Sequence, residues 1–125
     1  MPEGIISPTR SLGKTDIQIT PIGLGMMEFS GGGKLLGAAF PAISQEEKNA
    51  TVRAALEGGI NWFDTAELYG LGVSEASLAA ALKAAGKSDA EVIVATKWWP
   101  LFRTAHNSPR TIQDRIRFLD GYSIG

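Results

Sequence analysis

Short apolar runs recur along the chain, and each is followed by a segment in which apolar residues recur every three or four positions. The runs predict strands over residues 19–25, 60–64 and 92–97, and a fourth strand begins near Ile124. The last three start at positions 60, 92 and 124, so they are 32 residues apart, which is the length of a strand-helix unit. The pattern therefore predicts a repeated β/α arrangement.

The first predicted helix covers residues 45–57. Ser44 precedes this helix and Glu47 lies in its first turn, with the spacing of a capping box. In such a box the side chain of each residue accepts a hydrogen bond from the backbone N–H of the other. Gly58 and Gly59 can adopt the left-handed conformation that ends a helix.

Two more helices are predicted between and after the later strands. Ser74 opens one that stops at Gly86, and Ser108-Pro109 opens another that stops at Gly121. Glu75, in the first turn, has a carboxylate that favours the helix dipole and needs no further role. The buried faces of the three helices are expected to contain Val52, Ala55, Leu56, Leu78, Ala81, Leu82, Ala85, Ile112, Ile116 and Leu119.

Two irregular segments precede the first helix. Ile17 and Ile19 alternate with polar residues around the turn sequence GKTD, which predicts a hairpin leading into the first strand. Residues 26–43 are rich in glycine and have no helical period, so a long loop is predicted there. Its SGGGK stretch, residues 30–34, lacks the strand and helix context of a phosphate-binding loop and is interpreted as a flexible lid.

Regular alternation of strands and helices predicts an α/β fold with a parallel sheet and right-handed crossovers, either a doubly wound sheet or a (β/α)8 barrel. In both, functional side chains gather where the strands end. Asp64 ends one predicted strand and Lys97 ends the next, each on the same face as its strand's apolar residues. A lysine in that position needs a partner, and Asp64 is the expected one.

Each of these residues also has a structural explanation. Asp64 and Glu67 have capping-box spacing, so Asp64 could cap a short helix over residues 65–70. Tyr69 could be a core residue, and Lys97 could extend its charge to solvent from an apolar stem.

Composition excludes several classes of function. The 125 residues, 44% of them hydrophobic and 20% charged, are enough for one soluble domain with a core. Twelve basic and thirteen acidic side chains give a charge of −1, which argues against nucleic-acid and membrane partners. With no cysteine and one histidine, no metal site is expected. There is no signal sequence or apolar span of about 20 residues, so a cytoplasmic location is expected.

The motif GGINWFDTAELYGLGVSE, followed by VIVATKWWP, resembles the aldo-keto reductases, and so does LGKTDIQITPIGLGMM near the start. The resemblance runs from Arg10 to Gly125. It implies the N-terminal half of a (β/α)8 TIM barrel with a capping N-terminal β-hairpin, in which residues 1–125 supply three β/α units and the start of the fourth strand. A whole barrel takes about 250 residues.

The resemblance also implies site residues. Asp64, Tyr69 and Lys97 match three of the family's four catalytic residues, and the fourth, a histidine, lies beyond Gly125. His106 sits in the loop before the last helix and is expected to be an exposed loop residue.

The family's cofactor is NADPH, and Gly25, Met26 and Met27 match positions beside the nicotinamide ribose. Met27, Phe29, Trp98 and Trp99 could form an apolar wall over the nicotinamide and substrate, although packing in the core or at the rim is the more common role for such residues beside strands. The implied substrate is a small-molecule carbonyl compound.

The chemistry explains why the three catalytic residues belong together. A tyrosine hydroxyl is a weak acid near neutral pH, and a lysine ammonium beside it stabilises the phenolate. Tyr69 would be the general acid, Lys97 its electrostatic partner and Asp64 the residue that orients the lysine. The resemblance thus implies an NADPH-dependent reductase of which these 125 residues are a part, and we expect this part to be inactive by itself. The alternatives are a non-catalytic binding or regulatory module and a half-barrel that self-associates through exposed sheet edges.

Overall fold

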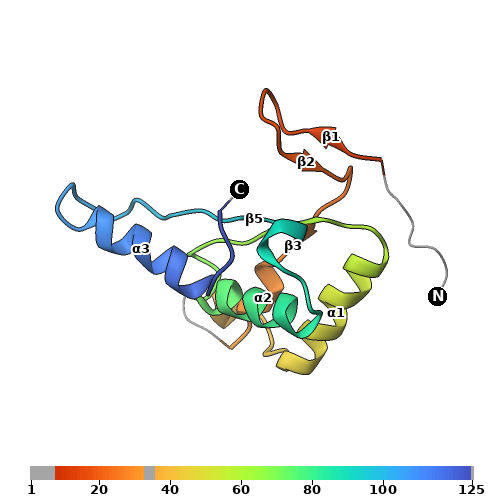
Figure 1. The fold of residues 1–125 in the computed structure, drawn as a ribbon. Helices are drawn as coiled ribbons and strands as arrows, with labels where there is room; N and C mark the ends of the chain where they lie inside the picture. The colour runs from red at the N-terminus through yellow and green to blue at the C-terminus, as the bar shows by residue number, and fades with distance from the viewer. Residues whose placement is uncertain (1–7, 33–35, 125) are drawn as a thin grey trace.

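The computed structural model describes residues 8–32 and 36–124. In that part of the chain a small antiparallel hairpin precedes a parallel sheet whose strands alternate with helices, as the sequence predicts (Figure 1). The strands are β1 Arg10–Ser11, β2 Gln18–Ile19, β3 Leu24–Gly25, β4 Trp62–Asp64 and β5 Ile93–Ala95. The helices are α1 Gln45–Glu57, α2 Val73–Ala84 and α3 Ser108–Phe118, with 3-10 helices η1 Met27–Ser30, η2 Leu36–Ala39 and η3 Asp89–Glu91.

The parallel sheet has the order β3-β4-β5, so consecutive strands are neighbours. Asp64 is opposite Gly25 on one side and Ala95 on the other. Ile124 forms a parallel bridge with Val94, which confirms that a fourth strand begins there. Figure 1 shows helices α1 and α2 together on one side of these strands and the hairpin β1-β2 on the other.

The predicted strand over residues 19–25 is two strands in the structure. Ile19 pairs with Arg10 in the hairpin, whereas Leu24 and Gly25 pair with β4. The chain leaves one sheet for the other between them, and Pro21, which has no N–H to donate, lies in that connection.

The core lies between the sheet and the helices. Phe63 alternates with Trp62 and Asp64 along β4, so it points toward the helices and is fully buried while its two neighbours are not. Residues of α1, α2 and β5 complete the cluster, chiefly Val52, Leu78, Ala81, Leu82 and Val94. The predicted buried faces of α1 and α2 are confirmed, with Ala55, Leu56 and Ala85 at their margins.

Helix α1 begins as predicted. The Ser44 hydroxyl accepts from the Glu47 N–H, and the Glu47 carboxylate accepts from the Ser44 N–H. One turn later, Lys48 turns its charged end into the protein and is 5% exposed. Its Nζ donates to the Phe29 carbonyl and to the Ser77 hydroxyl, each at 2.9 Å, so it joins α1 to η1 and α2.

Helix α2 begins at Val73, and the prediction that Ser74 caps it was wrong. The capping position belongs to Gly72, whose φ of +101° suits only glycine and whose Cβ, if present, would lie 2.7 Å from the Phe118 ring. The buried Ser74 hydroxyl instead donates to the Met26 carbonyl at 2.7 Å and accepts from Thr65 at 2.8 Å.

Helix α3 presents a different face from the one predicted. Ile112 and Ile116 are 42% and 50% exposed, whereas Thr111 and Arg115 are buried beside Leu119. The prediction assigned the isoleucines inward by hydrophobicity, but Arg115 occupies the inner face because two carboxylates pair with it there.

The predicted loop over residues 26–43 contains η1 and η2. Phe29 and Ser30 of η1 are buried, so this part of the loop packs against the core. Residues 33–35, which include part of the proposed lid, lie outside the described residues. Across residues 8–32 and 36–124, no helix combines the length and apolar character that crossing a bilayer requires.

Replacing Lys48 with methionine tests the link between α1, η1 and α2. Lys48→Met keeps most of the apolar stem but leaves the Phe29 carbonyl and the Ser77 hydroxyl without their buried donor, which costs about 1 to 3 kcal/mol. Urea unfolding followed by circular dichroism should show this loss. The exposed Lys14→Met is the control and should change stability by less than about 0.5 kcal/mol. Equal effects of the two substitutions would contradict the assignment.

Candidate active site

Asp64 and Lys97 meet at the carboxyl end of the parallel sheet. Backbone pairing continues beyond the strands, because the Thr65 N–H donates to Ala95 O at 2.8 Å and the Glu67 N–H to Lys97 O at 2.9 Å. This pairing places Lys97 beside the end of β4, and its Nζ donates to Asp64 Oδ1 at 2.7 Å and to Thr65 O at 3.0 Å. The predicted partnership of Lys97 with Asp64 is confirmed.

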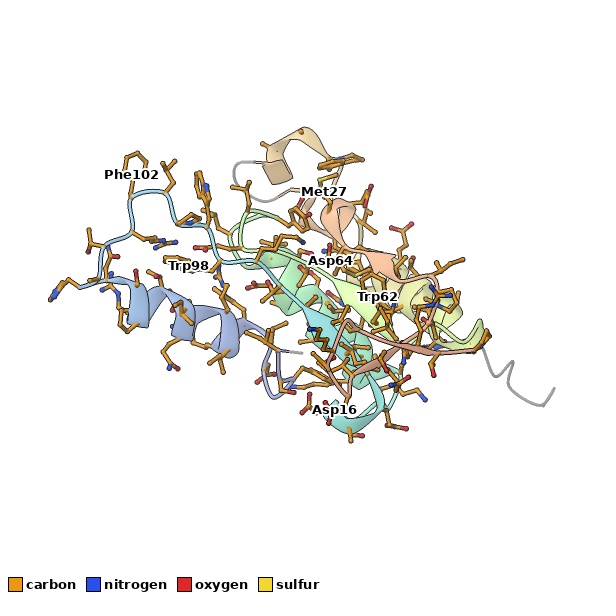
Figure 2. The ribbon with its side chains drawn as sticks, turned by 90° about the horizontal axis from the view of Figure 1, so that it is seen from above. Asp16, Met27, Trp62, Asp64, Trp98 and Phe102 are labelled. Carbon is orange, nitrogen blue, oxygen red and sulfur yellow. The ribbon has the colours of Figure 1, made fainter. Side chains whose placement is uncertain are left out.

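The ion pair is accessible to solvent. The side chain of Lys97 is 55% exposed and that of Asp64 is 37% exposed. Figure 2 shows Asp64 near the middle of the molecule, with Trp62 on one side and Trp98 on the other. An exposed pair of this kind, at the ends of two strands, adds little stability.

Tyr69 lies next to this pair, but the lysine does not bond its hydroxyl. Lys97 Nζ lies over the Tyr69 ring, 5.4 Å from its centre, in a cation-π arrangement. Tyr69 is half-buried, so it is not a core phenol. The three residues converge as expected, but the expectation that Lys97 Nζ bonds the Tyr69 hydroxyl as well as Asp64 is wrong, because the ammonium lies over the face of the ring.

A cavity of about 250 Å³ opens at this point of the structure. Its walls are mostly apolar, and Tyr69 and Lys97 supply its polar groups. The lining residues are Ala66, Leu68, Tyr69, Lys97, Trp98 and Trp99. Both tryptophans of the predicted apolar wall thus line the same cavity as the polar pair.

The other predicted site residues separate into exposed and buried ones. Gly25 is exposed, with no atom within 4 Å of where a Cβ would stand, and Met27 is 37% exposed. In contrast, the side chains of Met26 and Phe29 are 0% and 5% exposed and belong to the hydrophobic core. Met26 and Phe29 therefore have the alternative role, packing in the core. Only the backbone of Met26 lies at the end of β3, where its N–H donates to Asp64 O.

Two further expectations are settled by the geometry. Residues 65–70 form no helix, so Asp64 does not cap one. His106 is exposed in the loop before α3, as predicted.

Behind the cavity lies a buried ionic network that the sequence pattern did not reveal. Glu67 pairs with Arg103 and with Arg115 Nη1, the latter at 3.0 Å, and Arg115 Nε lies 3.2 Å from Glu75 Oε2. Thr96 donates to Glu75 Oε1 at 2.6 Å. The only signal in the sequence was the placement of Glu67 and Glu75 on either side of the Tyr69 motif.

Glu75 has a larger role than the predicted interaction with the helix dipole. Its side chain is fully buried, and burial raises the pKa of its carboxyl above the ordinary value of 4.5, while the Thr96 hydroxyl and the Arg115 charge act in the opposite direction. Glu75 thus joins α2 to α3 and to the segment after β5.

Parallel strands with helical crossovers, and polar residues gathered at their carboxyl ends, define a parallel α/β protein. The family model described as "Aldo/keto reductase family" matches residues 21–118. The chain belongs to the aldo/keto reductase family.

Curated relatives agree with this assignment. The chain is 38% identical over 88 residues to L-galactose dehydrogenase of Arabidopsis thaliana and 42% identical over 87 residues to aldo-keto reductase YhdN of Bacillus subtilis. Each alignment covers 70% of this chain but only 25% and 24% of the respective relatives. The chain therefore matches about a quarter of each curated relative.

Solved structures show the fold. A thermostable aldo-keto reductase in complex with the inhibitor epalrestat superposes with a TM-score of 0.75 at 26% identity, covering 94% of this chain and 40% of that one. An aldo-keto reductase from Klebsiella pneumoniae in complex with NADPH gives 0.64 at 24% identity, covering 86% and 34%. The fold is thus that of the N-terminal part of a (β/α)8 barrel, as expected.

The described part of the chain contains no cluster of side chains that could bind a metal ion. Residues 8–32 and 36–124 contain no group of three or more acidic or histidine side chains placed to hold a metal ion.

The pKa of Glu75 leads to a test of the ionic network. Because that pKa is raised, the native state retains a proton that the unfolded chain releases near pH 4.5. Raising the pH above 4.5 should therefore lower the free energy of unfolding, by about 1.4 kcal/mol for each tenfold difference between the native and unfolded acidities of this carboxyl. Glu75→Gln cannot exchange this proton, so the unsubstituted chain should lose stability relative to it between pH 4.5 and 7.

Urea unfolding of both proteins across that range measures the difference. Two curves that run parallel would contradict the assignment, since they would mean that Glu75 titrates alike in both states.

Proposed function

We propose that this chain carries the proton-donating part of an NADPH-dependent reductase that converts aldehydes or ketones to alcohols. The observation that carries the proposal is the Lys97 to Asp64 hydrogen bond of 2.7 Å beside Tyr69, at the edge of an apolar cavity. The family assignment supports the reaction class, and the relatives that match are dehydrogenases and reductases by name.

Tyr69 is the proposed general acid. Reduction of a carbonyl delivers a hydride to the carbon and a proton to the oxygen, and the C=O π bond becomes a C–H and an O–H bond. Tyr69 gives its phenolic proton to the oxygen and is left as phenolate. The Lys97 ammonium stabilises that negative charge, and Asp64 holds the ammonium at the strand end.

The residues at the end of β3 fit a flat ligand group beside this pair. Gly25 leaves open space in front of its backbone and is paired in register with Asp64. Met27, two residues further along the chain, is 37% exposed. These two residues and the Met26 backbone would hold the nicotinamide end of NADPH, which supplies the hydride when it is bound. The cofactor is bound in the Klebsiella relative, which supports this choice.

The cavity favours a small apolar carbonyl compound. Trp98 and Trp99 offer aromatic surface, Ala66 and Leu68 offer aliphatic surface, and Lys97 is the one charged residue in the lining. A substrate carbonyl placed against Tyr69 would leave its apolar part against the indole rings.

Replacing the proton donor tests the proposed function. In a polypeptide that continues these 125 residues through the remaining strands of the barrel, Tyr69→Phe should reduce kcat for NADPH-dependent aldehyde reduction by about 10² to 10⁴, the range for loss of a general acid. Cofactor affinity, measured by fluorescence titration, should stay within about twofold because no cofactor contact is removed.

The chain offers a matched control in its only other tyrosine. Tyr122 is buried and donates to Lys87 O at 2.6 Å, away from the cavity. Tyr122→Phe should keep its turnover at a modest cost in stability of about 1 kcal/mol. If Tyr69→Phe and Tyr122→Phe reduce turnover equally, Tyr69 has no special chemical role.

A separate proposal concerns the purified 125-residue chain. The family resemblance puts the fourth catalytic residue and the loops for the adenosine end of the cofactor beyond Gly125. The described part also leaves Ile112 and Ile116 of α3 exposed, and Ile124 meets β5 through a single bridge. Apolar surface and unpaired strand edges of this kind favour association with another copy.

We therefore expect this purified chain to self-associate, to bind NADPH weakly or not at all, and to show no turnover. Sedimentation velocity together with an NADPH fluorescence titration measures the first two. A monodisperse monomer that binds NADPH tightly would overturn this expectation, because it would show that residues 1–125 suffice for the cofactor site.

A further inference from the structure

The backbone of Trp99 is held on both sides by one pair of charged residues. Its N–H donates to Glu67 Oε2 at 2.8 Å, and its carbonyl accepts from Arg103 Nε at 3.1 Å. Arg103 Nη2 in turn pairs with Glu67 Oε1. The three groups form a closed ring, which we call the Trp99 clamp, defined by Glu67, Trp99 and Arg103.

Buried charged residues hold the Glu67 end of the clamp in place. The Glu67 side chain is 6% exposed, and Arg115 of α3 neutralises the same carboxylate from within the protein. With Glu75 the set contains two carboxylates and two guanidiniums, so its formal charge is zero. A buried set with balanced charge is costly to disturb, because removing one member leaves another without compensation.

The neighbouring tryptophan is held by the same helix. Trp98 Nε1 donates to Thr111 Oγ1 at 3.1 Å, and Thr111 lies one turn before Arg115 on the inner face of α3. Both indole walls of the cavity are thus connected to α3 by polar contacts. Beyond the clamp, Phe102 is 87% exposed and stands at the outer edge of the loop (Figure 2), so order in this loop comes from the clamp and not from apolar packing of its tip.

We propose that Glu67 and Arg103 are positioning residues that set where the Trp99 wall of the cavity stands and thereby decide how well bulky carbonyl compounds are accepted relative to small ones. This inference rests on the proposed reductase function for its substrate, while the positioning itself is a property of the loop. Neither residue lines the cavity, so both act through Trp99.

The geometry requires arginine at position 103. One guanidinium reaches the Trp99 carbonyl through Nε and the Glu67 carboxylate through Nη2 at the same time. A lysine has a single nitrogen and cannot hold this fork, so Arg103→Lys is a substitution that keeps the charge and breaks the ring. Arg103 is also 21% exposed, which makes its replacement safer for folding than that of Glu67 or Arg115.

A fluorescence experiment on the 125-residue chain tests the positioning without any assumption about activity. Two backgrounds each retain one indole, Trp99 in the first and Trp62 in the second. Trp62 lies on β4 and donates to Thr20 O at 2.9 Å, and it bonds no residue of the clamp, so it reports on the sheet. Into each background Arg103→Met, Arg103→Lys or the exposed control Arg110→Met is introduced.

Arg103→Met and Arg103→Lys should each shift the Trp99 emission to the red and raise its acrylamide quenching constant about twofold, because the indole becomes freer and wetter. The Trp62 emission should not move, and Arg110→Met should change neither reporter. An unchanged Trp99 signal would overturn the proposal. So would equal changes of the Trp62 and Trp99 signals, since they would show general loosening of the fold.

The second measurement uses the polypeptide that continues through the remaining strands. Arg103→Met should lower kcat/KM for benzaldehyde relative to propanal by about tenfold, chiefly through KM, while kcat for propanal stays within about twofold. An unchanged ratio would overturn the claim about selectivity. If the unsubstituted longer polypeptide shows no turnover, the proposed function is overturned instead. The Trp99 fluorescence would then be the test of whether the clamp positions Trp99.

Discussion

The parallel pairing of β4 with β5 is the interaction on which the site depends. It does not stop with the strands, because Thr65 and Glu67 continue to bond the backbone of the segment that holds Lys97. Two residues that are 33 positions apart in sequence thereby meet at one sheet edge. Backbone hydrogen bonds, which are made whatever the side chains are, thus place the ammonium and the carboxylate. Side chains then add the surrounding cavity.

Burial divides the charged residues near Tyr69 into two sets. Glu67, Glu75 and Arg115 lie behind the cavity and join α2, α3 and the loops into one unit. Asp64 and Lys97 lie in front and remain accessible. The buried set holds the walls in place at the cost of desolvation, whereas the accessible set keeps its two charges within reach of solvent and ligand. Such a division suits a binding site whose walls are rigid and whose charged groups a ligand can reach.

The sequence predicted the order of elements well because its strands and helices carry strong local signals. The capping box at Ser44 and the strand start at Ile124 are examples. It failed where tertiary contacts outweighed local chemistry. Ser74 looked like a cap, but the Met26 carbonyl and Thr65 take its hydroxyl, and Gly72 makes the turn. On α3 the isoleucines looked internal, but Arg115 is internal, since its carboxylate partners come from segments 40 and 48 residues earlier in the chain. Such distant pairing leaves no periodic trace in one sequence.

The contrast between the accessible pair and the buried network has a consequence for ionic strength. The field of an exposed charge decays over a Debye length of about 10 Å at 0.1 M salt and over a shorter distance at higher salt, whereas charges enclosed by protein are screened much less. The attraction between Lys97 and Asp64 therefore weakens as salt is added, while the network under Trp98 and Trp99 stays as it is. The protein thus separates an ion pair that the surrounding electrolyte can weaken from an ionic network that keeps the cavity walls in place when salt is added.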